Sequence, residues 1–297
     1  MTPSIEETVE LDSLALIKQL KRSPSAHKGD AGKVVIIGGA PGMAGALLLA
    51  GNAALHLGAG WTILEMLDPS SAIALVEHPE LMVRLAHPDA AGQLHNTKPD
   101  LIAIGPGLGD SSFAYEWLKA CLIYPVSPLI IDADALNLIS AHDDLLALLQ
   151  KRNQDFPNRS VITPHPGEAA RLLKISSMDV QDRRLITLKD LVKLTGSIVV
   201  LKGQHTLIGS PQHMSVQCNQ GNPGMATGGM GDVLTGSIAA IAAQGIRHQL
   251  DLWSSTCIAV ELHALAADTL VTKGVGPIGL TPSETILEMR SLLNKQL

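Results

Sequence analysis

The chain is organised around the stretch NQGNPGMATGGMGDVLTGSIAAIAAQG, from Asn219 to Gly245, which holds its most informative residues. It begins as a glycine-rich segment, in which Gly228, Gly229 and Gly231 lack the Cβ atoms that would keep backbone N–H groups from converging on an anion. From Val233 onward the residues are mostly apolar and are typical of a buried helix. A glycine-rich segment ahead of a helix predicts a phosphate-binding seat at the helix N-terminus.

Asp232 stands where this helix is expected to begin, and two roles are open to it. Asp is a favoured N-cap residue, and glycine loops before helices are common in α/β proteins, so Asp232 could simply cap the helix. A carboxylate beside a bound phosphate is repelled by it unless the carboxylate has a chemical task, such as taking a proton. From this stretch alone, both capping and catalysis stay open.

Length, charge and composition favour one α/β domain that works on a small molecule. The chain has 297 residues and a formal net charge of −6, with acids and bases spread without long runs. This pattern argues against binding to nucleic acid or to an anionic membrane surface. Aromatic residues make up only 2%, which leaves Ala, Val, Ile and Leu to fill the core between helices and a mostly parallel sheet. We expect a single domain over residues 1–297.

Cysteine spacing and the N-terminal sequence bear on location. Cys121, Cys218 and Cys257 are isolated, so neither a disulfide framework nor a zinc site is indicated. The first residues, MTPSIEETVELD, are acidic and polar, unlike a signal peptide, and no apolar run approaches the ~20 residues that a transmembrane helix needs. We therefore expect a cytoplasmic protein with no membrane partner.

Six buried strands are expected, alternating with helices. The first strand is followed by a glycine loop and a helix, an opening that imitates a dinucleotide-binding fold. Its glycines read G-G-A-P-G-M-A-G rather than G-x-G-x-x-G, which disfavours an NAD-binding first turn. The strands are expected at residues 33–37, 61–67, 100–104, 129–132, 160–163 and 197–201. The helices are expected at residues 13–20 and 44–57, from about residues 168, 180 and 233, and at 253–270.

Polar or glycine-rich clusters follow four of these strands. Because ligand crevices in open α/β sheets lie outside the carboxyl ends of the strands, the clusters should gather on one rim with the glycine-rich segment. Each has a plainer explanation, since His165 could only shape a turn and Lys202 could be a solvated surface residue. Asp132 and Asp134 could cap a helix instead of contacting a metal or a substrate hydroxyl. Their common location favours a phosphorylated nucleotide plus a second substrate. The clusters are Gly105 to Gly109; Asp132, Asp134 and Asn137; His165 and Glu168; and Lys202 to Thr206.

Six motifs carry a resemblance to a known family. In chain order they are HKGDAG at His27, GPGLG at Gly105, DADALN at Asp132, TPHPGE at Thr163, LKGQHT at Leu201, and NPGMATGGMGD ending in Asp232. Together they resemble the ADP-dependent NAD(P)H-hydrate dehydratases, metabolite-repair enzymes of the ribokinase-like superfamily. The resemblance implies a three-layer α/β sandwich, in which a mostly parallel central sheet has helices on both faces.

The resemblance also implies a reaction, the ADP-driven dehydration of the S-epimer of hydrated NADH or NADPH to the normal coenzyme, AMP and phosphate. Transfer of the ADP β-phosphoryl group would make the ring hydroxyl a better leaving group. Mg²⁺ is implied to bridge phosphate oxygens, with no protein ligands assigned. A homo-oligomer is implied as well, a tetramer being one form. We expect no epimerase domain ahead of His27.

Individual site residues follow from the matching motifs. Asp232 is similar to the catalytic base of the superfamily and would also contact the substrate. The backbone N–H groups of Gly229, Met230 and Gly231 would face the phosphoryl group. The segment that resembles the adenylate contact is Lys202, Gly203, Gln204, His205 and Thr206, and the positions that match contacts to the hydrated coenzyme are Gly45, Ala46, Gly107 and His165.

Two other functions stay open. A small-molecule kinase of the same superfamily, acting for example on a vitamin alcohol, would use Asp232 in the same way but would accept ATP and leave a phosphorylated product. A nucleotide-binding module without turnover would use Asp232 only as a helix cap.

Overall fold

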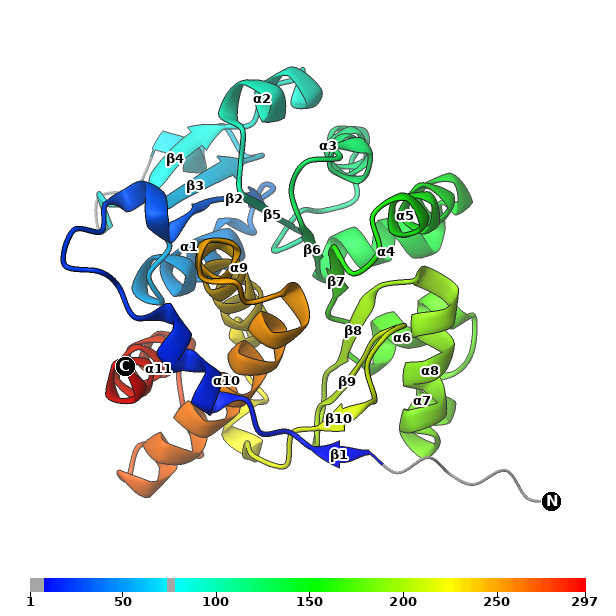
Figure 1. The fold of residues 1–297 in the computed structure, drawn as a ribbon. Coiled ribbons are helices and arrows are strands. Elements are labelled where there is room, and N and C mark those ends of the chain that lie inside the picture. The colour runs from blue at the N-terminus through cyan, green and yellow to red at the C-terminus, as the bar shows by residue number, and fades with distance from the viewer. Residues whose placement is uncertain (1–7, 74–77) are drawn as a thin grey trace.

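A ten-stranded sheet crosses the computed structural model, which describes residues 8–73 and 78–297 (Figure 1). The strand order is β1-β10-β9-β8-β7-β6-β5-β2-β3-β4. All pairs from β8 across to β4 are parallel, whereas β9 is antiparallel to both of its neighbours. The prediction of a mostly parallel sheet is therefore confirmed.

The six predicted strands occur within one residue of their expected bounds. Four further strands were not predicted, namely β1, β4, β9 and β10. They have two to four residues each. Those of β1, β4 and β10 are partly or largely exposed, and β9 is buried but only three residues long, so no long apolar run marks them. The strands are β1 Val9–Glu10, β2 Lys33–Gly38, β3 Trp61–Met66, β4 Met82–Leu85, β5 Leu101–Ile104, β6 Leu129–Ile131, β7 Ser160–Ile162, β8 Ile198–Leu201, β9 Leu207–Gly209 and β10 Val216–Gln217.

Helices follow most strands. The helix that follows the glycine-rich segment begins at Met230, earlier than expected. The α-helices are α1 Ala44–His56, α2 Ala90–Thr97, α3 Ser112–Ile123, α4 Ala133–Ala141, α5 Asp143–Asp155, α6 Pro166–Leu173, α7 Ser177–Asp182, α8 Arg184–Thr195, α9 Met230–His248, α10 Leu252–Thr272 and α11 Pro282–Gln296. The 3-10 helices are η1 Leu14–Leu20, η2 Lys28–Ala31, η3 Ser71–Ile73 and η4 Pro223–Met225. Within the described residues, no helix combines the length and the apolar character that spanning a bilayer requires.

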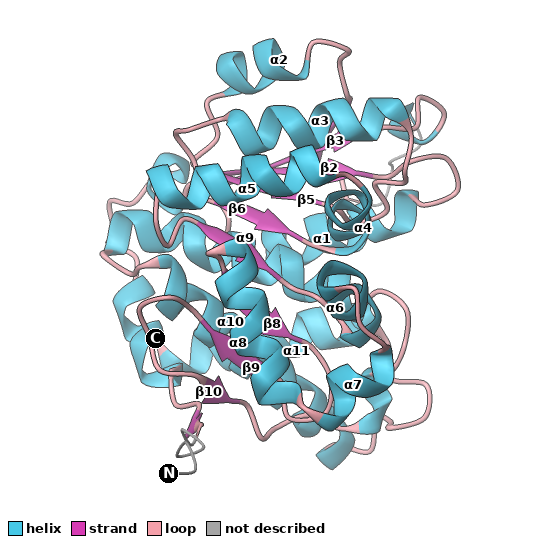
Figure 2. Ribbon diagram, turned by 90° about the vertical axis from the view of Figure 1, so that its right-hand side faces the viewer, coloured by secondary structure: helices cyan, strands magenta, loops and turns pink. Residues whose placement is uncertain are grey.

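The sheet separates two cores, because successive side chains of a strand point to opposite faces. In β2, Val34 and Ile36 pack in the core formed with α1, α9, α10 and α11. Val35 and Ile37 pack in the core formed with α2, α3, α4, α5, α6 and α8. Helices cover both faces of the sheet, and Figure 2 shows the same sandwich from its side. The predicted three-layer architecture is confirmed.

Helix α9 crosses α1 at very short range. A Cβ atom on Gly236 would lie 2.0 Å from the carbonyl oxygen of Ala50, so the two backbones can approach this closely only because Gly236 has no side chain. Almost every α9 residue from Val233 to Gly245 is buried. The crossing therefore fixes where the first turn of α9 meets the carboxyl ends of the strands.

Candidate functional site

One lysine joins the carboxyl ends of three strands to α9. The Nζ atom of Lys202, which follows β8, lies 2.7 Å from Oδ1 of Asp132 after β6. The same atom is 3.9 Å from Oε2 of Glu168 after β7. A Cβ atom on Gly231 would lie 3.4 Å from this nitrogen. The predicted rim thus exists, and Lys202 is 19% exposed rather than a solvated surface residue.

Asp132 is a buried anion with two donors. Lys202 Nζ donates to Oδ1 and Thr235 Oγ1 donates to Oδ2, each over 2.7 Å. Burial by itself would raise the pKa of Asp132, but the charge of Lys202 and these hydrogen bonds outweigh it and lower the pKa. The carboxylate makes no capping hydrogen bond to α4. Asp132 therefore occupies the N-cap position of α4 without capping it through its side chain, which instead holds Lys202 in place.

Asp134 connects the glycine loop after β5 to this cluster. Its Oδ2 accepts a hydrogen bond from the backbone N–H of Gly109 over 2.9 Å, and its Oδ1 accepts one from Asn137 Nδ2 over 3.3 Å. Asn137 Oδ1 accepts in turn from Arg171 Nε over 3.0 Å. The loop after β5, the start of α4 and helix α6 thereby form one continuous network.

Asp232 lies in the first turn of α9, two residues past its beginning. The N-cap position belongs to Gly229, whose φ of +96° is left-handed. No hydrogen-bond donor within residues 8–73 and 78–297 reaches the Asp232 carboxylate. Asp232 is therefore no helix cap, and its carboxylate is left free for another task.

The surroundings of Asp232 make its protonation sensitive near neutral pH. Burial raises the pKa of this carboxyl group to about 7, and the charge of Asp132 adds to the effect. Asp134 and Glu168 raise it further, whereas Lys202 acts in the opposite direction. A group whose pKa lies close to the ambient pH can both accept and release a proton, which is what general acid–base catalysis requires.

His165 shapes the start of α6 and also faces the cluster. Its Nδ1 accepts a hydrogen bond from the N–H of Gly167 over 3.0 Å, so the neutral ring carries its proton on Nε2. That nitrogen lies 3.2 Å from Oε1 of Glu168. Burial, followed by the positive charges of Lys202 and Arg171, lowers the pKa of His165. The turn-shaping role is therefore present, and the ring is also placed to donate a hydrogen bond on the rim.

Three of the positions that match coenzyme contacts form a second patch at the start of α1, whereas His165 lies apart from them at the start of α6. Gly107 has a φ of +58°, and a Cβ atom there would lie 2.5 Å from the carbonyl oxygen of Met43 and 3.2 Å from Cβ of Ala46. No other group comes within 4 Å of where a Cβ of Gly45 would be. Gly45, Ala46 and Gly107 thus meet beside open space, and Gly109 links their loop to Asp134.

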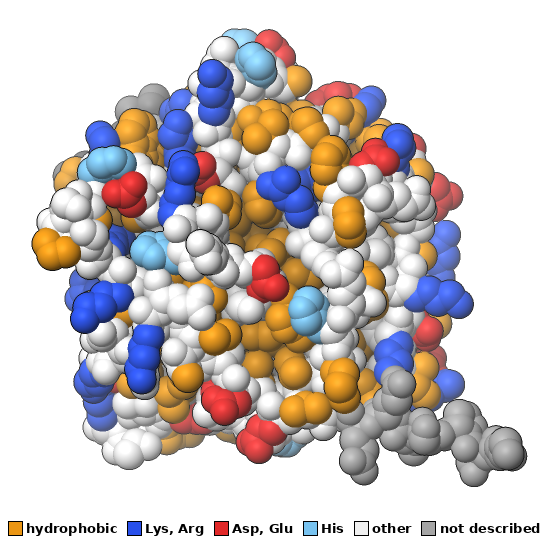
Figure 3. All heavy atoms as spheres, in the orientation of Figure 1, with side chains coloured by type: hydrophobic (Ala, Val, Ile, Leu, Met, Phe, Trp, Pro, Cys, Tyr) orange, Lys and Arg blue, Asp and Glu red, His pale blue; other side chains and the backbone are white. Residues whose placement is uncertain are grey.

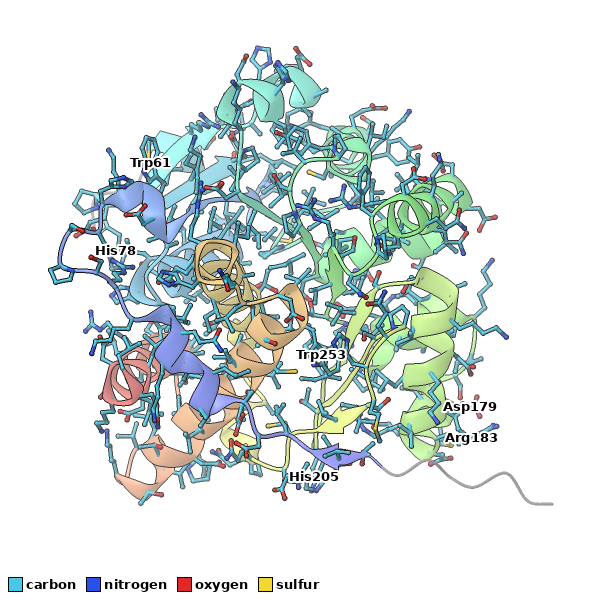
Figure 4. The ribbon with its side chains drawn as sticks, viewed as in Figure 1. Trp61, His78, Asp179, Arg183, His205 and Trp253 are labelled. Atoms are coloured by element: carbon cyan, nitrogen blue, oxygen red, sulfur yellow. The ribbon has the colours of Figure 1, made fainter. Side chains whose placement is uncertain are left out.

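The segment predicted to contact adenylate extends away from the carboxylates. In the described part of the chain, Lys202 is its one member that contacts the acidic cluster, while Gly203, Gln204 and His205 are exposed between β8 and β9. Figure 4 labels His205 on this loop. Arg184 supports the loop by donating to the carbonyl oxygens of Leu201 over 3.0 Å and Lys202 over 3.3 Å. Thr206 Oγ1 donates to Gly203 O over 3.1 Å. The adenylate role of these residues stays a prediction.

Asp268 and Thr235 support the site but were not singled out in the sequence. Asp268, on α10, accepts hydrogen bonds from Gly221 N over 2.8 Å and from Asn222 Nδ2 over 2.9 Å, which fixes the segment ahead of the phosphate-binding seat. No motif marks Asp268, whose partner is 47 positions away. Thr235 could have been found, because a residue three positions after Asp232 on a helix lies on a similar face.

Known proteins match most of the chain. Residues 34–287 match the family model described as NAD(P)H-hydrate dehydratase. The chain is 34% identical over 277 residues to the ADP-dependent (S)-NAD(P)H-hydrate dehydratase of Neisseria meningitidis, covering 92% of this chain and 89% of that protein. It is 37% identical over 290 residues to a bifunctional NAD(P)H-hydrate repair enzyme of Leishmania braziliensis, covering 92% of this chain and 51% of the relative. The chain thus spans about half the length of this relative.

A solved structure resembles the whole chain. The ADP/ATP-dependent NAD(P)H-hydrate dehydratase from Bacillus subtilis, co-crystallised with ATP/Mg²⁺, superposes with a TM-score of 0.82 at 26% identity and covers 98% of this chain and 99% of its own. The extent of the family match and the shared fold give the same assignment. The chain belongs to the NAD(P)H-hydrate dehydratase family and has its ribokinase-like fold.

Proposed function

We propose that this protein dehydrates the S-epimer of hydrated NADH or NADPH at the expense of ADP, giving NAD(P)H, AMP and phosphate. The observation that carries the proposal is the Asp232 carboxylate, whose pKa is raised to about 7 and which has no hydrogen-bond donor among the described residues. It stands at the N-terminus of α9, where an anionic phosphoryl group is favoured. The activity named for the Neisseria relative supports the same assignment.

Asp232 takes the first proton in this mechanism. It removes the hydrogen of the ring hydroxyl as the hydroxyl oxygen attacks the β-phosphorus of ADP, and the bridging P–O bond breaks to release AMP. The C–O bond of the phosphorylated ring then breaks, phosphate leaves, and loss of a proton from the adjacent carbon restores the double bond. Asp232 acts as a base only in its ionised form, so its task sets the acidic limit of the reaction.

Backbone groups and Lys202 stabilise the transferred phosphoryl group. The N–H groups of Gly231 and Asp232 have no acceptor in the described chain, as expected for the first turn of a helix. Met230 N lies 3.5 Å from Thr227 O, so this donor is only weakly engaged within the protein. Lys202, held by Asp132, supplies a fixed positive charge beside this seat.

The acidic surroundings fit a divalent cation that arrives with the nucleotide. Asp132, Asp134 and Glu168 all raise the pKa of Asp232, so the field at this rim favours positive charge. Among residues 8–73 and 78–297, no group of three or more His, Cys, Asp or Glu side chains could hold a metal by itself. Mg²⁺ would therefore be held mainly by phosphate oxygens and water, and the carboxylates of this rim would offset its charge. Bound there, Mg²⁺ neutralises charge on the phosphates.

The expected location and assembly belong to the same proposal. Cys121, Cys218 and Cys257 are all free and buried, which agrees with a reducing cytoplasm. The single-domain organisation rests on the length and composition of the chain, and a homo-oligomer rests on the resemblance of the motifs. Sedimentation of the purified protein measures the latter directly.

Incubation with hydrated NADH, ADP and Mg²⁺ tests the reaction. We expect the absorbance of NADH to return, with one AMP and one phosphate formed for each coenzyme restored. Turnover with ATP into a stable phosphorylated product would instead identify a kinase, and nucleotide binding without turnover would identify a binding module. Restoration at full rate without any nucleotide would refute the mechanism.

A further inference from the structure

A second pocket lies at the opposite end of α9 from the candidate site. It has a volume of about 270 Å³ and is lined by Arg22, His27, Asp30, Gln244, Arg247 and His248 among others. Gln244 is 12 positions after Asp232, which places it about 18 Å further along the helix at ~1.5 Å per residue. The pocket is therefore separate from the residues that the proposed reaction uses.

Basic side chains dominate this pocket, although the chain as a whole is acidic. Two arginines and two histidines line it, against the single carboxylate of Asp30. That carboxylate is already engaged, because Asp30 Oδ2 accepts a hydrogen bond from His27 N over 3.0 Å. In Figure 3, blue and pale-blue side chains gather on the left of the face, over the segment around η2 and the end of α9. The lining thus favours an anion.

Arg22 and His27 bring hydrogen-bond donors that the protein leaves unused. Arg22 donates through Nη2 to Gly58 O over 2.6 Å and to Gln244 Oε1 over 3.3 Å, and its Nε and Nη1 have no partner within the described residues. His27 Nδ1 accepts from Gly29 N over 3.1 Å, so the neutral ring carries its proton on Nε2. That N–H also has no partner in the described chain.

The helix dipole accounts for only two of the four basic side chains that line the pocket. Arg247 and His248 lie in the last turn of α9, where cations stabilise the helix. Arg22 and His27 come from another segment of the chain and do not belong to the last turn of α9. His27 begins the HKGDAG motif, which no step of the proposed reaction uses. Arg247 also faces Asp100, with Nη2 3.6 Å from Oδ1, but its side chain is 53% exposed and stays available.

We propose that this pocket binds a phosphate group, either inorganic phosphate or the phosphate end of a small metabolite. A guanidinium group offers paired N–H donors that match phosphate oxygens, and two such groups with imidazole donors match a dianion. The volume lies just below the ~300–1,000 Å³ of sites for larger ligands, which favours a small occupant. The proposal does not depend on the reaction assigned to Asp232.

Calorimetric titration with inorganic phosphate tests the proposal, with ADP and Mg²⁺ at saturation so that the seat on α9 is filled. We expect one phosphate to bind to the wild type. Arg247→Gln should bind it at least tenfold more weakly, because a charge-assisted contact is lost. Parallel titrations with ribose 5-phosphate and AMP identify the source, since tighter binding of either would assign the pocket to a phosphorylated metabolite.

Arg183→Gln is the matched control. Arg183 is an exposed arginine facing Asp179 over 3.5 Å, as Arg247 faces Asp100, and Figure 4 shows it on the opposite side of the molecule from Trp61, which neighbours η2. It should bind phosphate like the wild type. Arg22→Lys, which keeps the charge but not the paired donors, should weaken binding in a folded protein. Absence of phosphate binding to the ADP-saturated wild type, or equal affinity in Arg247→Gln, would overturn the proposal.

Discussion

The two ends of α9 are built in opposite ways. At the N-terminus, the Asp232 carboxylate and the N–H groups of Gly231 and Asp232 have no partners among the described residues, and several carboxylates crowd around them. At the C-terminus, the carbonyl oxygen of Gly245 accepts from the N–H groups of Gln249 and Leu250, and basic side chains surround the last turn. Both arrangements suit the helix dipole. The contrast indicates that unsatisfied groups belonging to the helix itself, rather than charge alone, mark the reactive end.

Asp232→Asn, at the N-terminal end of α9, should have the largest effect on turnover. The amide cannot accept the hydroxyl proton, so we expect turnover to fall by ~10²–10⁴-fold, while ADP still binds. Steady-state assays and calorimetry measure the two effects. At the other end of the helix, Arg247→Gln should keep the wild-type rate with ADP and hydrated NADH. If Asp232→Asn retains turnover within a few-fold of the wild type, Asp232 is not the base.

Lys202→Ala should destabilise the protein as well as weaken ADP binding. Asp132, with a side chain only 2% exposed, would lose its counter-ion, and breaking such a pair costs about 3 kcal/mol of unfolding free energy. Urea unfolding measures this cost. The matched variant Asp132→Asn/Lys202→Met removes both charges and should recover much of the stability. Equal losses in the single and double variants would show that the ion pair is not what holds the rim.

The pH dependence of kcat/KM and of stability tests the role of Asp232 further. Because a base must be ionised, kcat/KM should rise about tenfold per pH unit and level off above about 7, the pKa of Asp232. The sign for stability is the reverse, since this pKa is raised and ionisation of Asp232 costs folding free energy. That cost is absent near pH 4 and complete above pH 7. Asp232→Asn should therefore melt at a higher temperature than the wild type at pH 8, with little difference at pH 4. An equal difference at both pH values would contradict the assignment.

Asp268→Ala should have the smallest effect. It removes the acceptor of Gly221 N and Asn222 Nδ2, so the segment ahead of the seat loses two hydrogen bonds of about 1 kcal/mol each. We expect ADP affinity to fall a few-fold and the pH profile to keep its shape, because Asp232 is untouched. Asp268→Asn, which keeps one carbonyl acceptor, should fall in between. A changed pH profile in Asp268→Ala would show that the segment acts on Asp232 itself.

The sequence predicted where polar residues gather because the carboxyl ends of parallel strands meet at one edge. Lys202, Asp132 and Glu168 each follow a strand, so their common rim needed only the order of elements. The pairing of Lys202 with Asp132, 70 positions apart, could not be predicted, because it depends on β6, β7 and β8 being neighbours. The lack of a hydrogen-bond donor to the Asp232 carboxylate among the described residues could not be predicted either. It follows from a helix that begins at Met230, three residues earlier than its apolar pattern indicates.

The edge of the sheet beyond β8 was not predicted, for a different reason. β9 and β10 are short, and β10 pairs with β1 from the start of the described chain. With three and two residues they are too short to show an apolar pattern, and only the pair of β10 with β1 joins distant segments. Asp268 was not predicted for a related reason, because its contact with Gly221 joins two segments that no motif connects.

The contact between Gly236 and the Ala50 carbonyl has a consequence for protein engineering. Trimming side chains usually enlarges a binding site, but no side chain separates α9 from α1 at this point. The spacing between Asp232 on one helix and Gly45 on the other is therefore set by the backbones themselves. A larger substrate would have to be accommodated by redesigning the loops that follow β5 and β8, since any residue larger than glycine at position 236 would push the two helices apart.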